Sequence, residues 1–415
     1  MTDTGTGRQA AGTPVQATGK AIGAGLLSTL ALLMGLASFG IDLYLPAFPV
    51  MTTELSTTAT GVQLSLTAFL IGAGAGQLVF GPWSDRAGRV VPLVFGAVLF
   101  VAASVTATLA GSIELLVAAR LVQGLGGTAG MVIGRAIILD RARGTEAARA
   151  LSIMMLIGGI APIIAPVAGG ALVGPVGWRG LLGIVTGLGV IALACVLVFV
   201  RESLPREIRR ARAGTARRGG WRGLISRAYL GNTAAYAFGM AIMMAYISAS
   251  PFVYQDMIGL SAAAYGIAFA INAVGLMIAT TVAARLAGRV SLRGLTLTGL
   301  TISLAAVVAI VILTLTDAPA GWLMVPLFVA IAPLGLVFGN ATALAMSAVP
   351  PAATGAGSAL LGAVQFALAG LVAALVGIAG EHTAIPLGVT MLAAAIIALL
   401  GLLLATPRPR REPAA

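Results

Sequence analysis

The sequence predicts an all-α protein that crosses a membrane twelve times, with its helices in two pseudo-symmetric bundles of six. Hydrophobic residues make up 59% of the 415 positions and charged residues only 9%, whereas a soluble protein carries about 25% charged residues. So few charges cannot cover a water-facing surface. The apolar residues also gather into runs close to the roughly 20 residues that a helix needs to cross a bilayer.

These runs fall into two groups of six, separated by a polar gap. The first group covers 21–48, 61–81, 90–110, 113–139, 147–173 and 178–200, and the second covers 227–249, 262–284, 294–316, 321–346, 354–378 and 383–405. Only helices and closed barrels span a bilayer, and the runs lack the alternation of barrel strands. We therefore expect a tail at 1–20, a six-helix bundle at 21–200, a basic linker at 201–226, a second bundle at 227–405 and a tail at 406–415.

The basic residues between the runs lie on alternate turns, and cytoplasmic loops are the ones enriched in Lys and Arg. The turns on this side contain Arg86, Arg89, Arg141, Arg143, Arg149, Arg285, Arg289 and Arg293. Arg179 is the one basic residue predicted in an outside loop. This distribution predicts that both termini lie in the cytoplasm. We also expect a monomeric protein of the inner membrane, embedded in lipid. The distribution of basic residues also accounts for the net charge of +12 without a nucleic-acid partner.

One short turn carries a dense polar motif. The stretch 81–89 reads Gly-Pro-Trp-Ser-Asp-Arg-Ala-Gly-Arg, and it separates the second run from the third. Gly81 and Gly88 give the backbone freedom to turn, and Asp85, Arg86 and Arg89 hold the turn at the aqueous interface. The four residues 87–90 recur at 287–290, after the second run of the second half. This repeat supports two related halves with a binding site between them, near the middle of the membrane.

Charges within the runs indicate function, because an ionisable side chain in a bilayer is costly. Asp42 is about six residues inside the expected outer end of the first helix, and Arg120 lies at a similar depth on the fourth. We expect the two to pair. Asp42 would respond to protons, unless it is a hydrated carboxylate at a helix end, and Arg120 would be its coupling partner or a structural tie between helices. Asp140, at the exit of the fourth helix, lies near enough to bond Arg86 or Arg89 and so to latch this side of the bundle.

The fifth run contains two prolines four residues apart, Pro162 and Pro166, followed by Gly169 and Gly170. Proline removes a backbone donor and clashes with the preceding turn, so the helix is expected to bend. The glycines let the bent helix pack closely against a neighbour.

Together these motifs resemble the Bcr/CflA group of drug:proton antiporters in the major facilitator superfamily. The resemblance rests on Asp-Leu-Tyr-Leu-Pro-Ala-Phe-Pro at 42–49, the 81–89 loop, Arg120-x-x-Gln123-Gly124-x-x-Gly127, and the Pro162–Gly170 run, which follow in family order. It implies the superfamily fold, proton and substrate response at Asp42, and coupling through Arg120. A second acidic residue that some relatives carry on the first helix is absent, with Met34 and Gly35 in that turn. Neutral or weakly polar drugs are therefore favoured as cargo.

A drug pocket in such a protein would be mostly apolar, with a few directing polar groups. Polar or aromatic side chains within the runs are candidates to line it. The candidates are Asp42, Tyr44, Gln63, Gln123, Tyr236, Tyr246, Asn272, Asn340, Gln365 and Phe366. For the amides, contact with a ligand and hydrogen bonding between helices are equally open.

The expected function is export of a small, neutral drug such as a phenicol or a bicyclomycin-like compound, driven by proton antiport through alternating access. A proton-coupled symporter or facilitator for a nutrient or metabolite on the same fold is the alternative. The runs contain no paired carboxylates, no metal-ligand cluster and no nucleophile–base set, and the chain has no nucleotide-binding loop of the Gly-x-x-x-x-Gly-Lys type. Enzymatic activity, a metal site and a cofactor other than the coupling proton are not expected.

Overall fold

The computed structural model describes residues 22–204, 226–316, 318–350, 353–377 and 383–405. The expected tails at 1–20 and 406–415, and most of the expected linker at 201–226, lie outside the described residues. Among these residues the named elements are all helices, joined by short turns. The first half forms α1 (Ala24–Asp42), η1 (Leu45–Ala47), α2 (Phe48–Glu54), α3 (Ala59–Ala87), α4 (Val90–Thr108), α5 (Ile113–Arg141) and α6 (Gly144–Phe199). The second half forms α8 (Arg227–Phe252), η3 (Val253–Met257), α9 (Ala262–Leu286), α10 (Leu292–Leu315), η4 (Ala320–Leu323), α11 (Met324–Ile331), η5 (Ala332–Leu334), α12 (Gly335–Ser347), α13 (Thr354–Gly377) and α14 (Ile385–Leu404).

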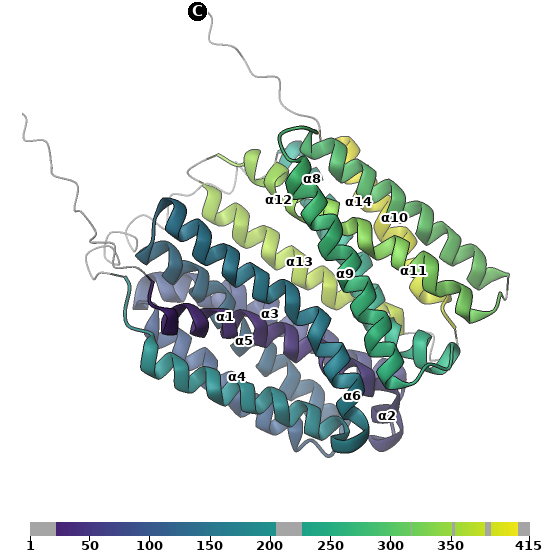
Figure 1. Cartoon of the computed structure of the whole chain (residues 1–415), viewed down its shortest axis with the longest axis horizontal. Helices are drawn as coiled ribbons and strands as arrows, with labels where there is room; N and C mark the ends of the chain where they lie inside the picture. Colours follow the sequence, from purple (N-terminus) through teal and green to yellow (C-terminus); the bar gives the residue numbers. More distant parts are fainter. Residues whose placement is uncertain (1–21, 205–225, 317, 351–352, 378–382, 406–415) are drawn as a thin grey trace, which may run out of the picture.

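The two halves form two bundles that lie side by side, α1–α6 in purple to teal and α8–α14 in green to yellow (Figure 1). Eleven described helical stretches are long and apolar enough to cross a membrane. One of them, α6, is 56 residues long and contains both the fifth and the sixth predicted runs. Its backbone stays helical through Pro162 and Pro166 and departs from helical dihedrals at Gly177, where φ is 65°. Twelve crossings therefore fit within the described helices.

Two helix ends differ from the expectation. The first helix was expected to end near Phe48, but α1 ends at Asp42. The chain then continues through η1 into α2, because Pro46 and Pro49 lack the backbone N–H groups that would continue the helix. In the other case, α3 remains helical through Gly81 and Pro82 to Ala87. The turn is therefore only two residues long, and Gly88, with φ of 97°, is the glycine that it needs.

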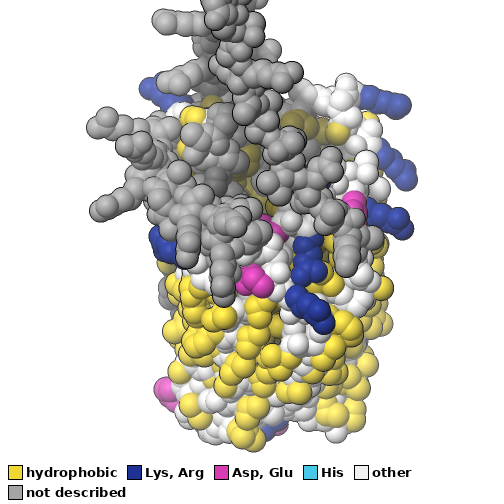
Figure 2. Space-filling model, turned by 90° about the vertical axis from the view of Figure 1, so that its left-hand side faces the viewer, with side chains coloured by type: hydrophobic (Ala, Val, Ile, Leu, Met, Phe, Trp, Pro, Cys, Tyr) yellow, Lys and Arg dark blue, Asp and Glu magenta, His cyan; other side chains and the backbone are white. Residues whose placement is uncertain are grey.

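The two ends of the bundles differ in charge. We call one the basic end, defined by Arg86, Arg89, Arg141, Arg285, Arg289 and Arg293, and the other the Glu54 end, defined by Glu54, Glu114, Arg179 and Asp256. In Figure 2 most of the Lys and Arg side chains lie in the upper part of the face, while its lower part is hydrophobic with few charges. Large apolar side chains are exposed on the helix faces, for example Val91 at 60% and Val325 at 69%. Such a surface is suited to lipid rather than water.

The bundles contact each other along two helix pairs, α3 with α13 and α6 with α9. Glycines make the contacts close. A Cβ on Gly170 would meet the carbonyl oxygen of Ala262, and a Cβ on Gly266 would meet that of Pro166. All four residues lie toward the Glu54 end, and from there α6 and α9 diverge toward their other ends (Figure 1).

Hydrogen bonds between the bundles also lie toward the Glu54 end. Gln63 Nε2 donates to the Ser248 carbonyl oxygen at 3.0 Å, and Gln255 Nε2 donates to that of Pro46 at 3.1 Å. The Thr60 hydroxyl donates to the carbonyl oxygen of Gly377. The two bundles are therefore joined at this end.

Candidate functional site

Arg120 is completely buried and is held by aromatic rings and neutral oxygen atoms. Its guanidinium carbon lies 4.4 Å from the ring centroid of Tyr44 and 4.5 Å from that of Phe69. Nη1 donates to Gln123 Oε1 at 2.5 Å, and Nη2 donates to the Gly40 carbonyl oxygen at 2.6 Å. Cation–π contacts with these two rings partly replace the lost hydration of the guanidinium. Arg120 thereby connects α5 to the end of α1.

The hydrogen bonds continue beyond Arg120 on both sides. Gln123 Nε2 donates to the Ser104 hydroxyl at 2.6 Å, which ties α4 to the same site. The Tyr44 hydroxyl lies 3.0 Å from that of Ser65 on α3. The sequence candidates Tyr44 and Gln123 therefore surround Arg120.

Asp42 is also buried, with 4% of its surface exposed. The ion pair that we expected with Arg120 is not formed among the described residues, because the Arg120 donors are directed to Gln123 and to the Gly40 carbonyl instead. No other hydrogen bond or ion pair reaches the Asp42 carboxylate from the described part of the chain. The η1 segment that follows Asp42 contacts α9 of the second bundle. The carboxylate is therefore a buried group at the boundary between the two bundles.

A cavity of about 150 Å³ lies between the bundles, enclosed by α1, α3 and α5 on one side and by α8 and α13 on the other. It is lined by Ala37, Ser38, Ile41, Phe69, Leu70, Ala73, Gly124, Thr128, Met131, Met240, Met244, Gln365, Phe366 and Ala369. None of these side chains is ionisable. Gln365 is the one amide among them, and its Oε1 accepts a hydrogen bond from the Tyr236 hydroxyl at 2.6 Å.

Of the ten cavity candidates, Gln365 and Phe366 line this cavity, and Tyr236 adjoins it through Gln365. Asp42, Tyr44 and Gln123 lie in or beside the Arg120 site. Asn272 and Asn340 use their Nδ2 groups within their own helices, bonding the carbonyl oxygen atoms of Ala268 and Leu336. Gln63 joins the bundles at the Glu54 end. Tyr246 stacks on Phe269, with ring centroids 5.5 Å apart.

Most of the cavity lining was not singled out from the sequence. Three methionines, Met131, Met240 and Met244, contribute flexible, polarisable side chains that adapt to different shapes. Phe69 occupies the wall next to Arg120. In a chain this apolar, such residues are indistinguishable from ordinary core residues by pattern alone.

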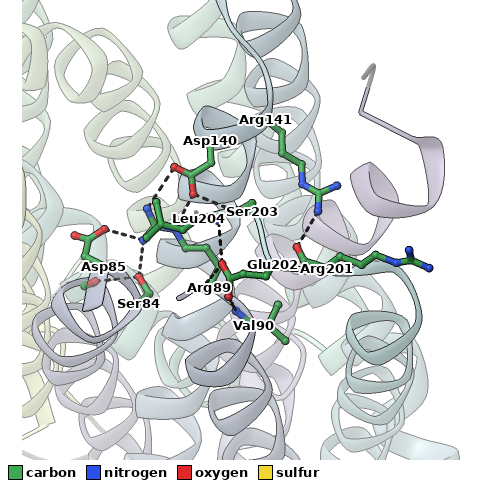
Figure 3. A network of polar contacts seen from close by, with 11 residues as sticks. Ser84, Asp85, Arg89, Val90, Asp140, Arg141, Arg201, Glu202, Ser203 and Leu204 are labelled. Atoms are coloured by element: carbon green, nitrogen blue, oxygen red, sulfur yellow. Dashed lines mark hydrogen bonds and ion pairs between the residues drawn. The ribbon is translucent and has the colours of Figure 1, made fainter. Parts of the chain in front are cut away.

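At the basic end, Arg89 organises a polar cluster that comprises Ser84, Asp85, Arg89, Asp140, Glu202 and Ser203 (Figure 3). Arg89 Nε donates to Asp140 Oδ2 at 2.8 Å, and its Nη1 donates to Asp85 Oδ1 at 2.8 Å. Burial lowers the pKa of Arg89, but hydrogen bonds and charge from Asp140, and then from Asp85, outweigh burial, so the pKa is raised above its ordinary value. The arginine is therefore charged at every physiological pH.

The cluster also binds the segment that follows α6. The Glu202 carboxylate accepts the backbone N–H of Arg89 at 3.0 Å, and the Ser203 hydroxyl donates to Asp140 Oδ2 at 3.1 Å. The negative charge of this carboxylate also interacts favourably with the positive end of the helix dipole at the N-terminus of α4. Arg86, which the sequence proposed as an alternative partner of Asp140, is exposed. Through these contacts the cluster joins the ends of α3 and α5 to the segment that follows α6.

The repeated loop in the second half has the same backbone feature but a different environment. Gly288 has φ of 87°, close to the 97° of Gly88. Arg289, however, is exposed, whereas Arg89 is buried. Arg285 stands where the first half has Asp85, so the second loop lacks that acidic partner.

Two packed helical bundles with a cavity between them define a multi-pass membrane transporter. The Major Facilitator Superfamily model matches residues 30–374, and the chain belongs to this family.

Relatives with assigned names are similar along most of their length. The chain is 34% identical to an uncharacterized MFS-type transporter, YdgK, of Bacillus subtilis, covering 89% of this chain and 94% of the relative. It is 27% identical to a bicyclomycin resistance protein homolog of Haemophilus influenzae, covering 92% and 96%. It is 32% identical to a chloramphenicol resistance protein of Pseudomonas aeruginosa, covering 82% and 80%. The resemblance drawn from the motifs is confirmed by these relatives.

Solved structures agree in fold. An inward-facing bacterial homolog of the human lysosomal transporter Spinster superposes with a TM-score of 0.70 at 17% identity, covering 92% of this chain and 95% of that one. A D-xylose-proton symporter gives 0.70 at 16% identity, covering 91% and 96%. The relatives and the fold are those of transporters, not enzymes.

Proposed function

We propose that this protein exports small, largely neutral amphiphilic drugs from the cytoplasm in exchange for protons. The observation that carries the proposal is the pairing of an uncharged, adaptable cavity between the bundles with a buried carboxylate, Asp42, beside it. A neutral cavity suits a cargo such as a phenicol. Among the residues that the structure describes, this carboxylate is the acidic side chain near the cavity that can carry a proton across the membrane.

The cavity has to widen to take a drug. Pockets that hold drug-sized molecules usually measure about 300–1,000 Å³, more than the 150 Å³ of the cavity between the bundles. Rocking of the bundles about the α3–α13 contact supplies the extra space. Cargo would enter from the basic end while the Glu54 end is closed, and it would leave after the closure is reversed.

Proton movement supplies the driving force. Inward flow of one proton contributes about 1.4 kcal/mol per pH unit and about 2.3 kcal/mol per 100 mV. Asp42 would take up a proton when the Glu54 end opens to the outside, and would release it inward when drug binds. This scheme places both termini in the cytoplasm and the protein in the inner membrane, as the distribution of Arg predicts.

Everted membrane vesicles test the proposal. Their lumen is acidified by respiration, and a quenched acridine dye reports the pH gradient. We expect chloramphenicol added outside to be pumped inward, to release luminal protons and to restore fluorescence, and we expect vesicles with Asp42→Asn to respond only weakly. Unchanged quenching by the wild-type protein, or accumulation of a sugar or carboxylate by intact cells, would instead favour a symporter or facilitator.

A further inference from the structure

We propose that Phe69 is the positioning residue through which cargo in the cavity acts on Arg120 and Asp42. The inference rests on the function proposed above and adds a route for the coupling. The sequence did not predict that the cavity and the two charged residues would be separate sites. Neither Asp42 nor Arg120 lines the cavity, so cargo and proton do not share one set of contacts.

Phe69 forms the wall between the two sites. It lines the cavity on α3, and its ring centroid lies 4.5 Å from the guanidinium carbon of Arg120. The side chain is 1% exposed. A displacement of this ring by cargo would therefore act directly on the guanidinium.

Phe69 is packed against α1 and α5, so a displacement of its ring would be transmitted to these helices. A Cβ built on Gly40 would lie 3.5 Å from the Phe69 ring, so the ring packs against the backbone of α1. On the other side, a Cβ on Gly124 would meet the Phe69 carbonyl oxygen, so α3 and α5 are in close backbone contact there. On the side away from the cavity the ring is closely packed, so cargo that pushes it in that direction would shift its neighbours.

The path from Phe69 to Asp42 is short. Arg120 Nη2 donates to the Gly40 carbonyl oxygen at 2.6 Å, and Asp42 follows Gly40 by two residues at the end of α1. A shift of the ring would change the Arg120–Gly40 contact and with it the position of the last turn of α1. The surroundings of the Asp42 carboxylate would therefore change as cargo binds.

The chain provides a matched control. Phe366 lines the same cavity from α13, in the other bundle. The cation–π contacts of Arg120 in the described structure are with Tyr44 and Phe69 and do not include Phe366. Phe366→Leu and Phe69→Leu remove the same ring atoms from the cavity wall, but only the second removes a contact of Arg120.

The experiment measures chloramphenicol binding to purified protein in detergent at pH 6 and pH 8. The wild type is expected to bind at least about 5-fold more tightly at pH 8, because binding releases a proton. Phe366→Leu weakens binding at both pH values and keeps that ratio. Phe69→Leu weakens binding to a similar extent, but its ratio falls below about 2-fold, and Phe69→Tyr restores it.

Two outcomes would contradict this inference, and they are distinguishable. A wild-type ratio near one would overturn the proposed proton exchange and this inference with it. A wild-type ratio of at least about 5-fold that Phe69→Leu retains would leave the exchange intact and reduce Phe69 to a part of the cavity wall. If Phe69→Leu does not fold, Phe69→Met is used in its place. Its ratio of chloramphenicol affinity at pH 8 to that at pH 6 then tests the inference in the same way.

Discussion

Nη2 of Arg120 lies 2.6 Å from the carbonyl oxygen of Gly40, so the buried charge of α5 is attached to the backbone of α1 rather than to the carboxylate two residues further on. A guanidinium can do this because its planar fork presents several donors at fixed angles while its faces stack on aromatic rings. The arrangement keeps Asp42 free of a permanent ion pair. A carboxylate without such a partner can gain and lose a proton during a transport cycle.

Replacing Arg120 by lysine tests whether transport needs the geometry of the guanidinium as well as its positive charge. Lysine keeps the charge but cannot stack on Tyr44 and Phe69 while reaching Gln123 and Gly40 together. We expect Arg120→Lys to reduce transport at least about 10-fold and to cost about 2 kcal/mol of stability. Transport in proteoliposomes and thermal unfolding in detergent measure the two effects.

The control for this substitution is Arg179→Lys at the Glu54 end. Arg179 also stacks on an aromatic ring, that of Trp178 at 4.1 Å, but its side chain is 44% exposed. Little change in either measurement is expected there. Normal transport by Arg120→Lys would show that a positive charge at this position is sufficient.

The Tyr236–Gln365 hydrogen bond orients the one amide in the cavity wall. Tyr236→Phe removes the donor to Gln365 Oε1, so the amide becomes free to rotate. We expect the KM for chloramphenicol to rise about 5-fold, which corresponds to about 1 kcal/mol, with little change in kcat. Tyr229→Phe is the control, because the Tyr229 hydroxyl donates to the Gly357 carbonyl oxygen, outside the cavity lining. Equal KM values for Tyr236→Phe and the wild type would indicate that Gln365 does not contact cargo.

Gly170 is expected to be essential for closing the Glu54 end. A methyl group there would meet the carbonyl oxygen of Ala262, whereas a Cβ on Gly174, one turn further along α6, would meet nothing within 4 Å. We expect Gly170→Ala to reduce transport about 10-fold, whereas Gly174→Ala stays near wild type.

Spin labels at Thr58→Cys and Ser261→Cys in a Cys195→Ala background report the closure directly. These positions cap α3 and α9 on opposite bundles. Gly170→Ala is expected to shift the distance distribution toward longer values. A distribution identical to that of Gly174→Ala would show that the α6–α9 contact does not limit closure.

The two carboxylates on Arg89 are expected to differ in importance. The side chain of Asp140 is 11% exposed and that of Asp85 is 46% exposed, while the Arg89 side chain is 4% exposed. Asp140→Asn leaves a buried guanidinium poorly compensated, and we expect a loss of about 3 kcal/mol. Asp85→Asn is expected to cost only about 0.5 kcal/mol, because solvent screens that pair. Thermal unfolding of the two variants side by side tests the ranking, and equal losses would contradict it.

The sequence predicted the helices, and it predicted that Asp140 would bond Arg86 or Arg89, of which Arg89 is the partner. Apolar runs of membrane length are helical, and Arg89 and Asp140 meet because the ends of α3 and α5 lie together. The Asp42–Arg120 ion pair was expected from depth alone and is not formed. Depth does not specify where a side chain points, and the aromatic rings of Tyr44 and Phe69 determine the position of the guanidinium.

The cavity could not be predicted from the sequence for a related reason. In a soluble protein an apolar side chain that lines a site stands out against a polar surface. Here Met131 and Met240 resemble every lipid-facing and core neighbour, so only the packing of the two bundles distinguishes them. Gln365 could be singled out because it is an amide in an apolar run.

The first helix was placed correctly except at its end, because Pro46 and Pro49 end it early.

The central claim is that Asp42 gives up a proton when cargo binds. The most direct test is proton release from purified protein in weakly buffered solution on addition of chloramphenicol, followed with a pH indicator dye. The account predicts that the wild-type protein releases protons and that Asp42→Asn binds the drug without releasing any. Equal proton release by Asp42→Asn and the wild type would contradict it.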